Sequence, residues 1–155
     1  MEFTNHLADA EKFDQLKTKV LKFVLYKKRT ENEVREKFEH DIDENQLEDI
    51  IEILKENNYI NDKEYIERSI KEFKVLKNLS IKEINYKLQQ KKVNKEILDT
   101  YIYENREDLL EFEIQSAKNI LRKKLKILED SDAVKKYLYQ KGYMNESIDI
   151  ALEDL

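Results

Sequence analysis

The chain has 155 residues and no cysteine, so it can form neither a disulfide nor a thiolate metal site. Asp, Glu, Lys and Arg make up 41% of the residues, which leaves few side chains for a single deep core, and the formal charge is -5. No apolar run approaches the length that spans a bilayer, and the amino terminus carries acidic residues before any apolar segment. These features predict a cytoplasmic protein without membrane segments.

Apolar residues recur at spacings of three and four through nearly the whole chain, which is typical of amphipathic helices. Pro is absent and Gly occurs once, so the usual helix breakers are almost missing. We predict an all-helical fold with helices over residues 12–27, 31–39, 44–57, 62–77, 81–91, 95–105, 107–127, 131–141 and 146–154. Capping-box spacing marks three starts, in the pairs Thr30 and Glu33, Asn61 and Glu64, and Ser80 and Glu83. The first nine residues have weak periodicity and are expected to form a frayed arm.

The sequence resembles itself when it is displaced by fifty residues. Four aligned columns are wholly apolar, and a fifth holds residues that favour helix N-caps. The columns are Val20, Ile70 and Ile120; Leu25, Val75 and Leu125; Val34, Ile84 and Val134; Phe38, Leu88 and Leu138; and Thr30, Ser80 and Asp130. One inserted residue near Met144 extends the match to Leu47, Ile97 and Ile148 and to Ile51, Tyr101 and Leu152. We therefore predict a single repeat domain of three tandem three-helix repeats, over residues 12–57, 62–105 and 107–154, stacked into an elongated, curved rod.

Charge is unevenly distributed along the chain. Residues 30–67 hold 14 acids and 4 bases, a net charge of -10, whereas residues 68–95 hold 9 bases and 2 acids, a net charge of +7. Residues 118–142 hold 8 bases and 3 acids, a net charge of +5. Two explanations stay open: the lysines solvate exposed helix faces, or the segregated charge presents opposite faces to opposite partners.

A basic cluster recurs where the first helix of each repeat ends, as at Lys27 to Arg29 and at Arg122 to Lys126. Charge repeated at one structural position would follow a repeating partner, such as a polyanion or a protein filament. The candidate partner-binding residues are Lys27, Lys28, Arg29, Arg68, Lys71, Lys74, Lys77, Lys87, Lys91, Lys92, Arg122, Lys123, Lys124, Lys126, Lys135 and Lys136.

The sequence offers little material for catalysis. His6 and His40 are the two imidazoles, and the carboxylates fall in runs typical of solvated helix starts and faces. A single glycine excludes the glycine-rich phosphate loops of nucleotide-binding folds. We therefore predict a binding protein that is not an enzyme and that has no catalytic residue, cofactor or metal.

Four stretches of the sequence, in their order and spacing, resemble the RecX family of bacterial recombination regulators. They are "VLKFVLYKKRTENEVREKF" (residues 20–38), "NNYINDKEYIERSI" (57–70), "LSIKEINYKLQQKKV" (79–93) and "YLYQKGYMNESIDIAL" (137–152). The likeness covers almost the whole chain. One departure concerns the Lys-Gly turn that follows the second helices of the family: it is present as Lys141-Gly142, but His40-Asp41 and Lys91-Lys92 replace it earlier, which makes the loop geometry there an open question.

The resemblance implies a regulator that binds the RecA filament on single-stranded DNA and inhibits its ATPase and strand-exchange activities, and we expect the protein to be a monomer. It would thereby modulate homologous recombination, DNA repair and the SOS response, with single-stranded DNA as a second candidate partner. Two alternatives stay open. Three-helix units also occur in proteins that bind duplex DNA directly, although the negative net charge disfavours this function. A helical adaptor without effect on any recombinase is the other alternative.

Overall fold

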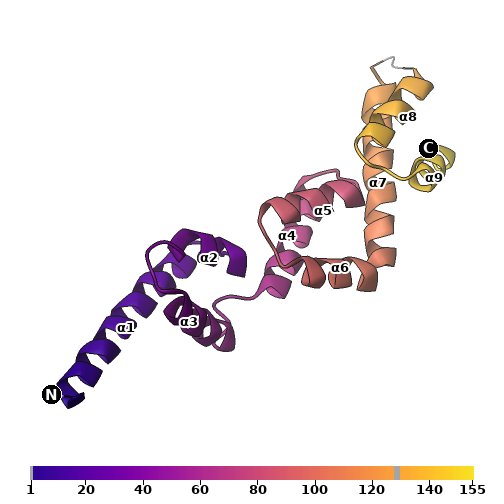
Figure 1. Ribbon diagram of the computed structural model, residues 1–155. Coiled ribbons are helices and arrows are strands. Elements are labelled where there is room, and N and C mark those ends of the chain that lie inside the picture. Colours follow the sequence, from indigo (N-terminus) through magenta and orange to yellow (C-terminus); the bar gives the residue numbers. More distant parts are fainter. Residues whose placement is uncertain (1, 128–129) are drawn as a thin grey trace. The chain divides into compact units, whose positions relative to one another are not determined.

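The computed structural model describes residues 2–127 and 130–155, with side chains from residue 6 onward within these ranges. Within them all regular structure is helical, which confirms the prediction of an all-helical fold (Figure 1). The helices are α1 (Glu2–Tyr26), α2 (Glu31–Phe38), α3 (Glu44–Glu56), α4 (Asp62–Leu76), α5 (Ile81–Gln90), α6 (Lys95–Glu104), α7 (Arg106–Leu125), α8 (Ser131–Gln140) and α9 (Asn145–Glu153). None of these helices is long and apolar enough to cross a membrane.

Helix α1 begins at Glu2, so the predicted start at residue 12 and the frayed arm are wrong for residues 2–9. Met1 lies outside the described residues. Side chains 6–12 are exposed all round the helix. An amphipathic pattern arises where one face of a helix is buried, and this part of α1 has no buried face that could mark it in the sequence.

The chain divides into two compact units, the first formed by Met1–Tyr65 with Lys91–Asn94 and the second by Ile66–Gln90 with Lys95–Leu155. In the first unit α1, α2 and α3 pack against one another. Phe23 and Phe38 meet edge to face there, with ring centroids 5.5 Å apart. The buried core of this unit consists of Val20, Val24, Val34, Phe38, Ile42, Leu47, Ile50, Ile51, Leu54 and Ile60.

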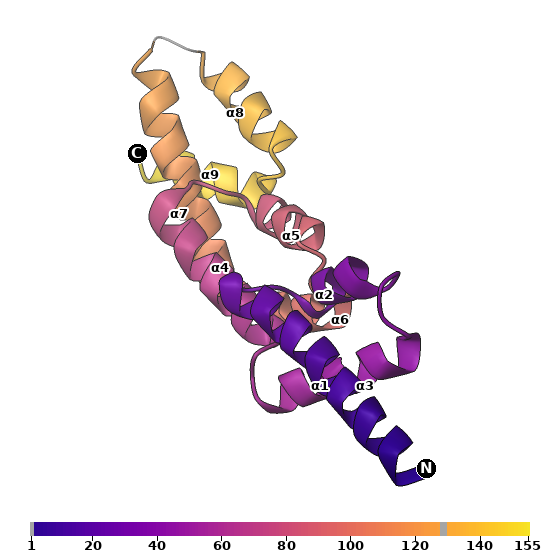
Figure 2. The same ribbon diagram turned by 90° about the vertical axis from the view of Figure 1, so that its left-hand side faces the viewer.

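Helix α7 is the centre of the second unit. It contacts α5 and α6 as well as α8 and α9, and Figure 2 shows α8 and α9 beside it. Its buried positions recur at spacings of four, at Leu109, Glu113, Ala117 and Leu121. A hydrophobic core joins Ala117, Leu121, Val134, Leu138, Tyr143, Ile148 and Ala151.

The predicted capping boxes at Thr30 and Ser80 are confirmed. Thr30 Oγ1 accepts a hydrogen bond from the amide of Glu33 at 3.2 Å, and Glu33 accepts one from the amide of Thr30 at 3.0 Å. Ser80 and Glu83 make the same pair of bonds at 3.0 and 3.1 Å. At the third predicted site, Asn61 Oδ1 accepts from the amide of Glu64 at 3.0 Å. These bonds satisfy amides that the first helical turn leaves without a partner.

Two of the aligned columns need correction. Leu25 is 62% and Val75 82% exposed, because both lie at helix ends beyond the core that covers the middle of each helix. In the third-helix column Ile97 is 37% exposed, whereas its neighbour Leu98 is fully buried. Leu98 follows Leu47 by fifty-one residues, so the inserted residue lies before α6 and not near Met144.

The turns after α5 and α8 share a left-handed residue. Lys92 has φ 63° and Gly142 has φ 93°, and the two are fifty residues apart. After α8 the amide of Tyr143 bonds to the carbonyl of Leu138 at 3.1 Å, which satisfies an otherwise free carbonyl at the helix end. The lysine in place of glycine therefore leaves this backbone conformation unchanged, which answers the question of loop geometry at Lys91-Lys92.

Gly142 is far less replaceable than Lys92. A Cβ at Gly142 would lie 2.8 Å from Lys82 Cβ and 3.2 Å from Ser80 Oγ, in a left-handed conformation that L side chains rarely adopt. We expect Gly142→Ala to lower the free energy of unfolding by about 2 kcal/mol. Urea denaturation followed by circular dichroism measures this loss, and Lys92→Gly, which should cost less than about 1 kcal/mol, is the matched control. Equal stability of wild type and Gly142→Ala would contradict the steric argument.

Candidate partner-binding surface

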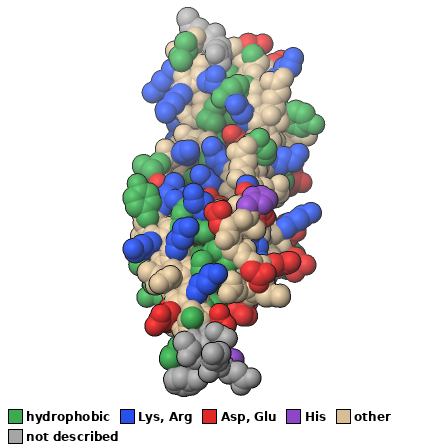
Figure 3. Space-filling model, turned by 60° about the vertical axis from the view of Figure 1, so that its left-hand side comes forward, with side chains coloured by type: hydrophobic (Ala, Val, Ile, Leu, Met, Phe, Trp, Pro, Cys, Tyr) green, Lys and Arg blue, Asp and Glu red, His purple; other side chains and the backbone are tan. Residues whose placement is uncertain are grey.

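The first helices of the predicted repeats end in exposed apolar side chains beside basic ones. Tyr26 is 87% exposed at the end of α1, and Leu76 is 67% exposed at the end of α4. After α7, Ile127 is 72% exposed. Figure 3 shows blue Lys and Arg side chains interspersed with green apolar ones. Single exposed apolar side chains are common on protein surfaces, so it is their recurrence beside cations at the ends of successive first helices that makes these ends candidates for partner binding.

Several predicted basic residues are engaged within the protein. Lys28 Nζ lies 4.0 Å from a Glu64 carboxylate oxygen, Lys74 pairs with Asp108, and Lys92 pairs with Glu36. The guanidinium carbon of Arg29 lies 4.3 Å from the ring centroid of Phe23, Lys124 Nζ lies 4.1 Å from that of Tyr137, and Lys77 Nζ lies 5.8 Å from that of Phe73. These contacts favour a structural contribution from these six side chains.

Other predicted basic residues have exposed side chains. Besides Lys28, Lys77 and Lys92, the exposed members of the set are Lys27, Arg68, Lys71, Lys91, Arg122, Lys123, Lys126, Lys135 and Lys136, whereas Lys87 is half-buried. Arg122 and Lys123 belong to the last turn of α7, where cations are stabilised by the negative end of the helix dipole. Their binding role stays a prediction.

A set of hydrogen bonds, here called the first joint, holds the start of α2 to the turn after α5 within the first unit. Thr30 Oγ1 donates to the carbonyl of Lys91 at 2.8 Å. Asp62 accepts two backbone bonds, from Glu31 N at 2.9 Å and from Asn94 N at 2.8 Å. Thr30 and Asp62 are both buried, so these bonds are shielded from water.

The second joint repeats this pattern in the second unit. Ser80 Oγ donates to the carbonyl of Lys141 at 2.7 Å, across the same sixty-one residues that separate Thr30 from Lys91. Glu113, which is fully buried, accepts from Ile81 N at 2.9 Å and from Met144 N at 3.5 Å. Ser147 Oγ also donates to Glu113, at 2.5 Å. Each joint thus uses a hydroxyl at one helix start and a buried carboxylate to connect two helix starts with a turn, and the second joint adds the hydroxyl of Ser147.

The sequence interpretation missed the joints because it assigned the carboxylates to solvated faces. A signal was present at Glu113, since this acid lies on the stripe of Leu109 and Ala117, where an apolar residue is expected. The second joint also affects its surroundings. Burial, together with the nearby Glu83 and Glu113 carboxylates, raises the pKa of the Tyr143 phenol.

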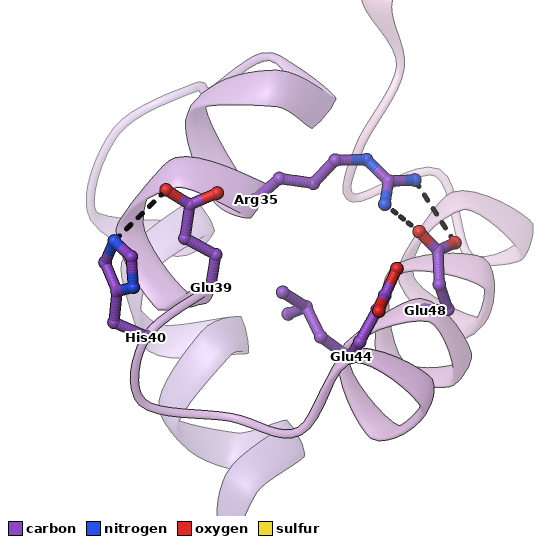
Figure 4. A pocket seen from close by; sticks show the side chains of 6 residues that line it. Arg35, Glu39, His40, Glu44 and Glu48 are labelled. Atoms are coloured by element: carbon purple, nitrogen blue, oxygen red, sulfur yellow. Dashed lines mark hydrogen bonds and ion pairs between the residues drawn. The ribbon is translucent and has the colours of Figure 1, made fainter.

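A pocket of about 440 Å³ lies between α2 and α3, lined by Arg35, Glu39, His40, Glu44, Leu47 and Glu48 (Figure 4). Arg35 bridges the pocket to Glu48 and also bonds to Glu31 at 3.2 Å. Burial would raise the pKa of Glu31, but hydrogen bonds from Lys55 and Arg35 outweigh it and hold the pKa below its ordinary value. Within the described ranges, no three His, Asp or Glu side chains gather as a metal site requires. The pocket is therefore an ion-paired seam between two helices.

Three relatives with similar sequences bear the same name. The chain is 33% identical over 147 residues to the regulatory protein RecX of Clostridium beijerinckii, across 90% of this chain and 68% of that protein. The chain belongs to the RecX family. It is also 30% identical to the regulatory protein RecX of Lactococcus lactis subsp. cremoris and 29% identical to that of Staphylococcus carnosus, across 94% and 97% of this chain. No family model matches the chain.

Solved structures of RecX share the fold of this chain. The crystal structure of RecX from Lactobacillus salivarius superposes with a TM-score of 0.82 at 22% identity, across 94% of this chain and 97% of that one. A second crystal structure of the regulatory protein RecX gives a TM-score of 0.79 at 19% identity, across 97% of this chain and 77% of that one. The chain spans only 56% and 58% of the Lactococcus and Staphylococcus proteins, so those RecX proteins contain residues without a counterpart here.

Proposed function

We propose that this protein is a regulator that binds the RecA filament on single-stranded DNA and inhibits its ATPase and strand-exchange activities. It thereby modulates homologous recombination, DNA repair and the SOS response in the cytoplasm, acting as a monomer. Membership of the RecX family, whose members matched here are named regulatory proteins, supports the regulatory role. The sequence resemblance supplies the filament as the partner.

The observation that carries the proposal is the recurrence of exposed apolar and basic side chains where successive first helices end. Tyr26 precedes Lys27 at the end of α1, and Leu76 precedes Lys77 at the end of α4. After α7, Lys126 precedes Ile127. A filament offers the same surface once per subunit, so a binder with the same contact at regular intervals gains affinity from each one.

Three tandem three-helix repeats would place these apolar and basic side chains at regular intervals. The two joints support this arrangement, since they use equivalent residues fifty or fifty-one positions apart. Helices α1, α4 and α7 open the three repeats, and each joint connects one repeat with the next. An elongated, curved rod is the form that such stacking is expected to take.

Titration of the protein into RecA bound to single-stranded DNA tests the proposal directly. We expect the rate of ATP hydrolysis to fall at protein concentrations well below that of RecA, because one bound regulator blocks a stretch of filament. Unchanged hydrolysis at equimolar protein would favour the helical adaptor. Sequence-preferring binding to bare duplex in a gel-shift assay, together with unchanged hydrolysis, would favour direct DNA binding.

A further inference from the structure

Both joints follow one chemical rule. The second helix of one repeat begins with a buried hydroxyl that donates to a carbonyl in the turn of the next repeat. That turn carries basic residues, Lys91 with Lys92 in the first joint and Lys141 in the second. A carboxylate from the next first helix then accepts the amide that follows the hydroxyl residue. Donor therefore meets acceptor at each contact.

The trailing end of the array, where the second helix of the last repeat begins, does not follow this rule. The N-cap of α8 is Asp130, which is exposed and accepts a bond from Asp132 N at 3.3 Å. A carboxylate satisfies the start of its own helix as well as a hydroxyl does, but it has no proton to donate to a carbonyl. Asp132 takes the place of Asn32, whose side chain donates to the carbonyl of Lys92 at 2.9 Å in the first joint. Both donors are thus replaced by groups that only accept.

The leading end of the array, formed by α1 and the turn after α2, does not follow the rule either. Asp62 precedes the buried Ile70 by eight positions, and Glu113 precedes Leu121 by the same interval. Leu121 is fully buried, whereas Ile120 of the aligned column is only partly buried. Eight positions before the buried Val20 the residue is Lys12, an exposed ammonium that has donors only.

The turn of the leading end has the opposite charge to the other turns. After α2 it reads Glu39, His40 and Asp41, all exposed, where the turns after α5 and α8 carry lysines. Asp130 of a second copy would meet these acids at short range, and like charges repel.

We propose that Lys12 and Asp41 at one end, and Asp130 and Asp132 at the other, terminate the repeat array and prevent copies of this chain from joining head to tail. The same stacking that builds the array would otherwise add further copies, since a head-to-tail contact joins two different surfaces and leaves one of each free for the next copy. The inference rests on the three-repeat arrangement proposed above and is independent of the filament as partner, because its test contains no RecA and no DNA.

Giving both ends the types of side chain that the two joints use tests the proposal. The leading-end variant carries Lys12→Asp and Asp41→Lys, the trailing-end variant carries Asp130→Ser and Asp132→Asn, and the joined variant carries all four changes. All four positions are exposed, so the fold should persist, as far-ultraviolet circular dichroism will verify. By analytical ultracentrifugation over a hundredfold range of concentration, we expect wild type to stay at one mass. The joined variant should form species whose mean mass grows with concentration beyond a dimer.

The two partial variants locate the new contact. Each has one restored end, so an equimolar mixture should form a one-to-one pair and nothing larger. Lys22→Asp, Asp49→Lys, Glu146→Gln and Asp149→Ser make the same charge changes at other exposed positions and serve as the matched control, which should keep the wild-type mass. A constant mass for the joined variant overturns the proposal. So does equal assembly of the control, or a mixture that grows beyond pairs.

Discussion

Replacing Glu113 with alanine is expected to lower the free energy of unfolding by about 3 kcal/mol. The carboxylate is fully buried and accepts from two backbone amides and from Ser147 Oγ. Alanine would leave these three donors without an acceptor where water does not reach, and it would open a void in place of four heavy atoms. Glu113→Gln should lose less, because its amide oxygen can still accept from Ile81 N.

Chemical denaturation followed by circular dichroism measures both variants, and Glu111→Ala on the exposed face of the same helix is the control. That control should stay within about 0.5 kcal/mol of wild type. Hydrogen exchange at the amides of Ile81 and Met144 gives a local test, since both should exchange faster in Glu113→Ala. A loss of stability no larger than that of Glu111→Ala would show that Glu113 does not hold the second joint.

Reversing the charge of Lys123 and Lys126 to glutamate is expected to weaken inhibition of the RecA ATPase by about tenfold or more. Both side chains are exposed, so the change removes attraction to the partner without disturbing the core. Lys124 is left unchanged because it lies over the Tyr137 ring, where a glutamate would also affect packing. The concentration for half inhibition, measured at two salt concentrations, provides the readout.

A variant with Lys19→Glu and Lys22→Glu has the same net charge and changes two exposed residues of α1 outside the predicted set. It should inhibit as wild type does if binding depends on local contacts. If both variants lose inhibition equally, the effect comes from overall charge. Full inhibition by the Lys123 and Lys126 variant would remove this cluster from the binding surface.

The helices and their caps could be predicted from the sequence because they depend on local spacing. Thr30 and Ser80 are each followed by a glutamate three residues later, which predicts a helix start, and the predicted capping bonds are present. Burial at helix ends could not be predicted in this way. Leu25 and Val75 fit an apolar column, yet both side chains are exposed at the last turn of their helices.

The joints could not be predicted because they depend on contacts across sixty-one residues and on backbone groups, which carry no sequence signature. A Thr or Ser that caps its own helix looks the same in the sequence whether or not its hydroxyl also donates to a distant carbonyl. The acid at position 113 was the one visible anomaly. Only the fold shows that it accepts bonds from two helix starts.

The first compact unit includes a segment from later in the chain, and this affects the order in which the chain folds during synthesis. Residues Met1–Tyr65 form this unit together with Lys91–Asn94, and the start of α2 bonds to the carbonyl of Lys91. A ribosome delivers the chain from its amino terminus, and units generally fold as their last residues emerge. The first unit is therefore complete only after α5 has left the ribosome, so a nascent chain that ends at Tyr65 exposes the buried Thr30 hydroxyl and Asp62 carboxylate to water.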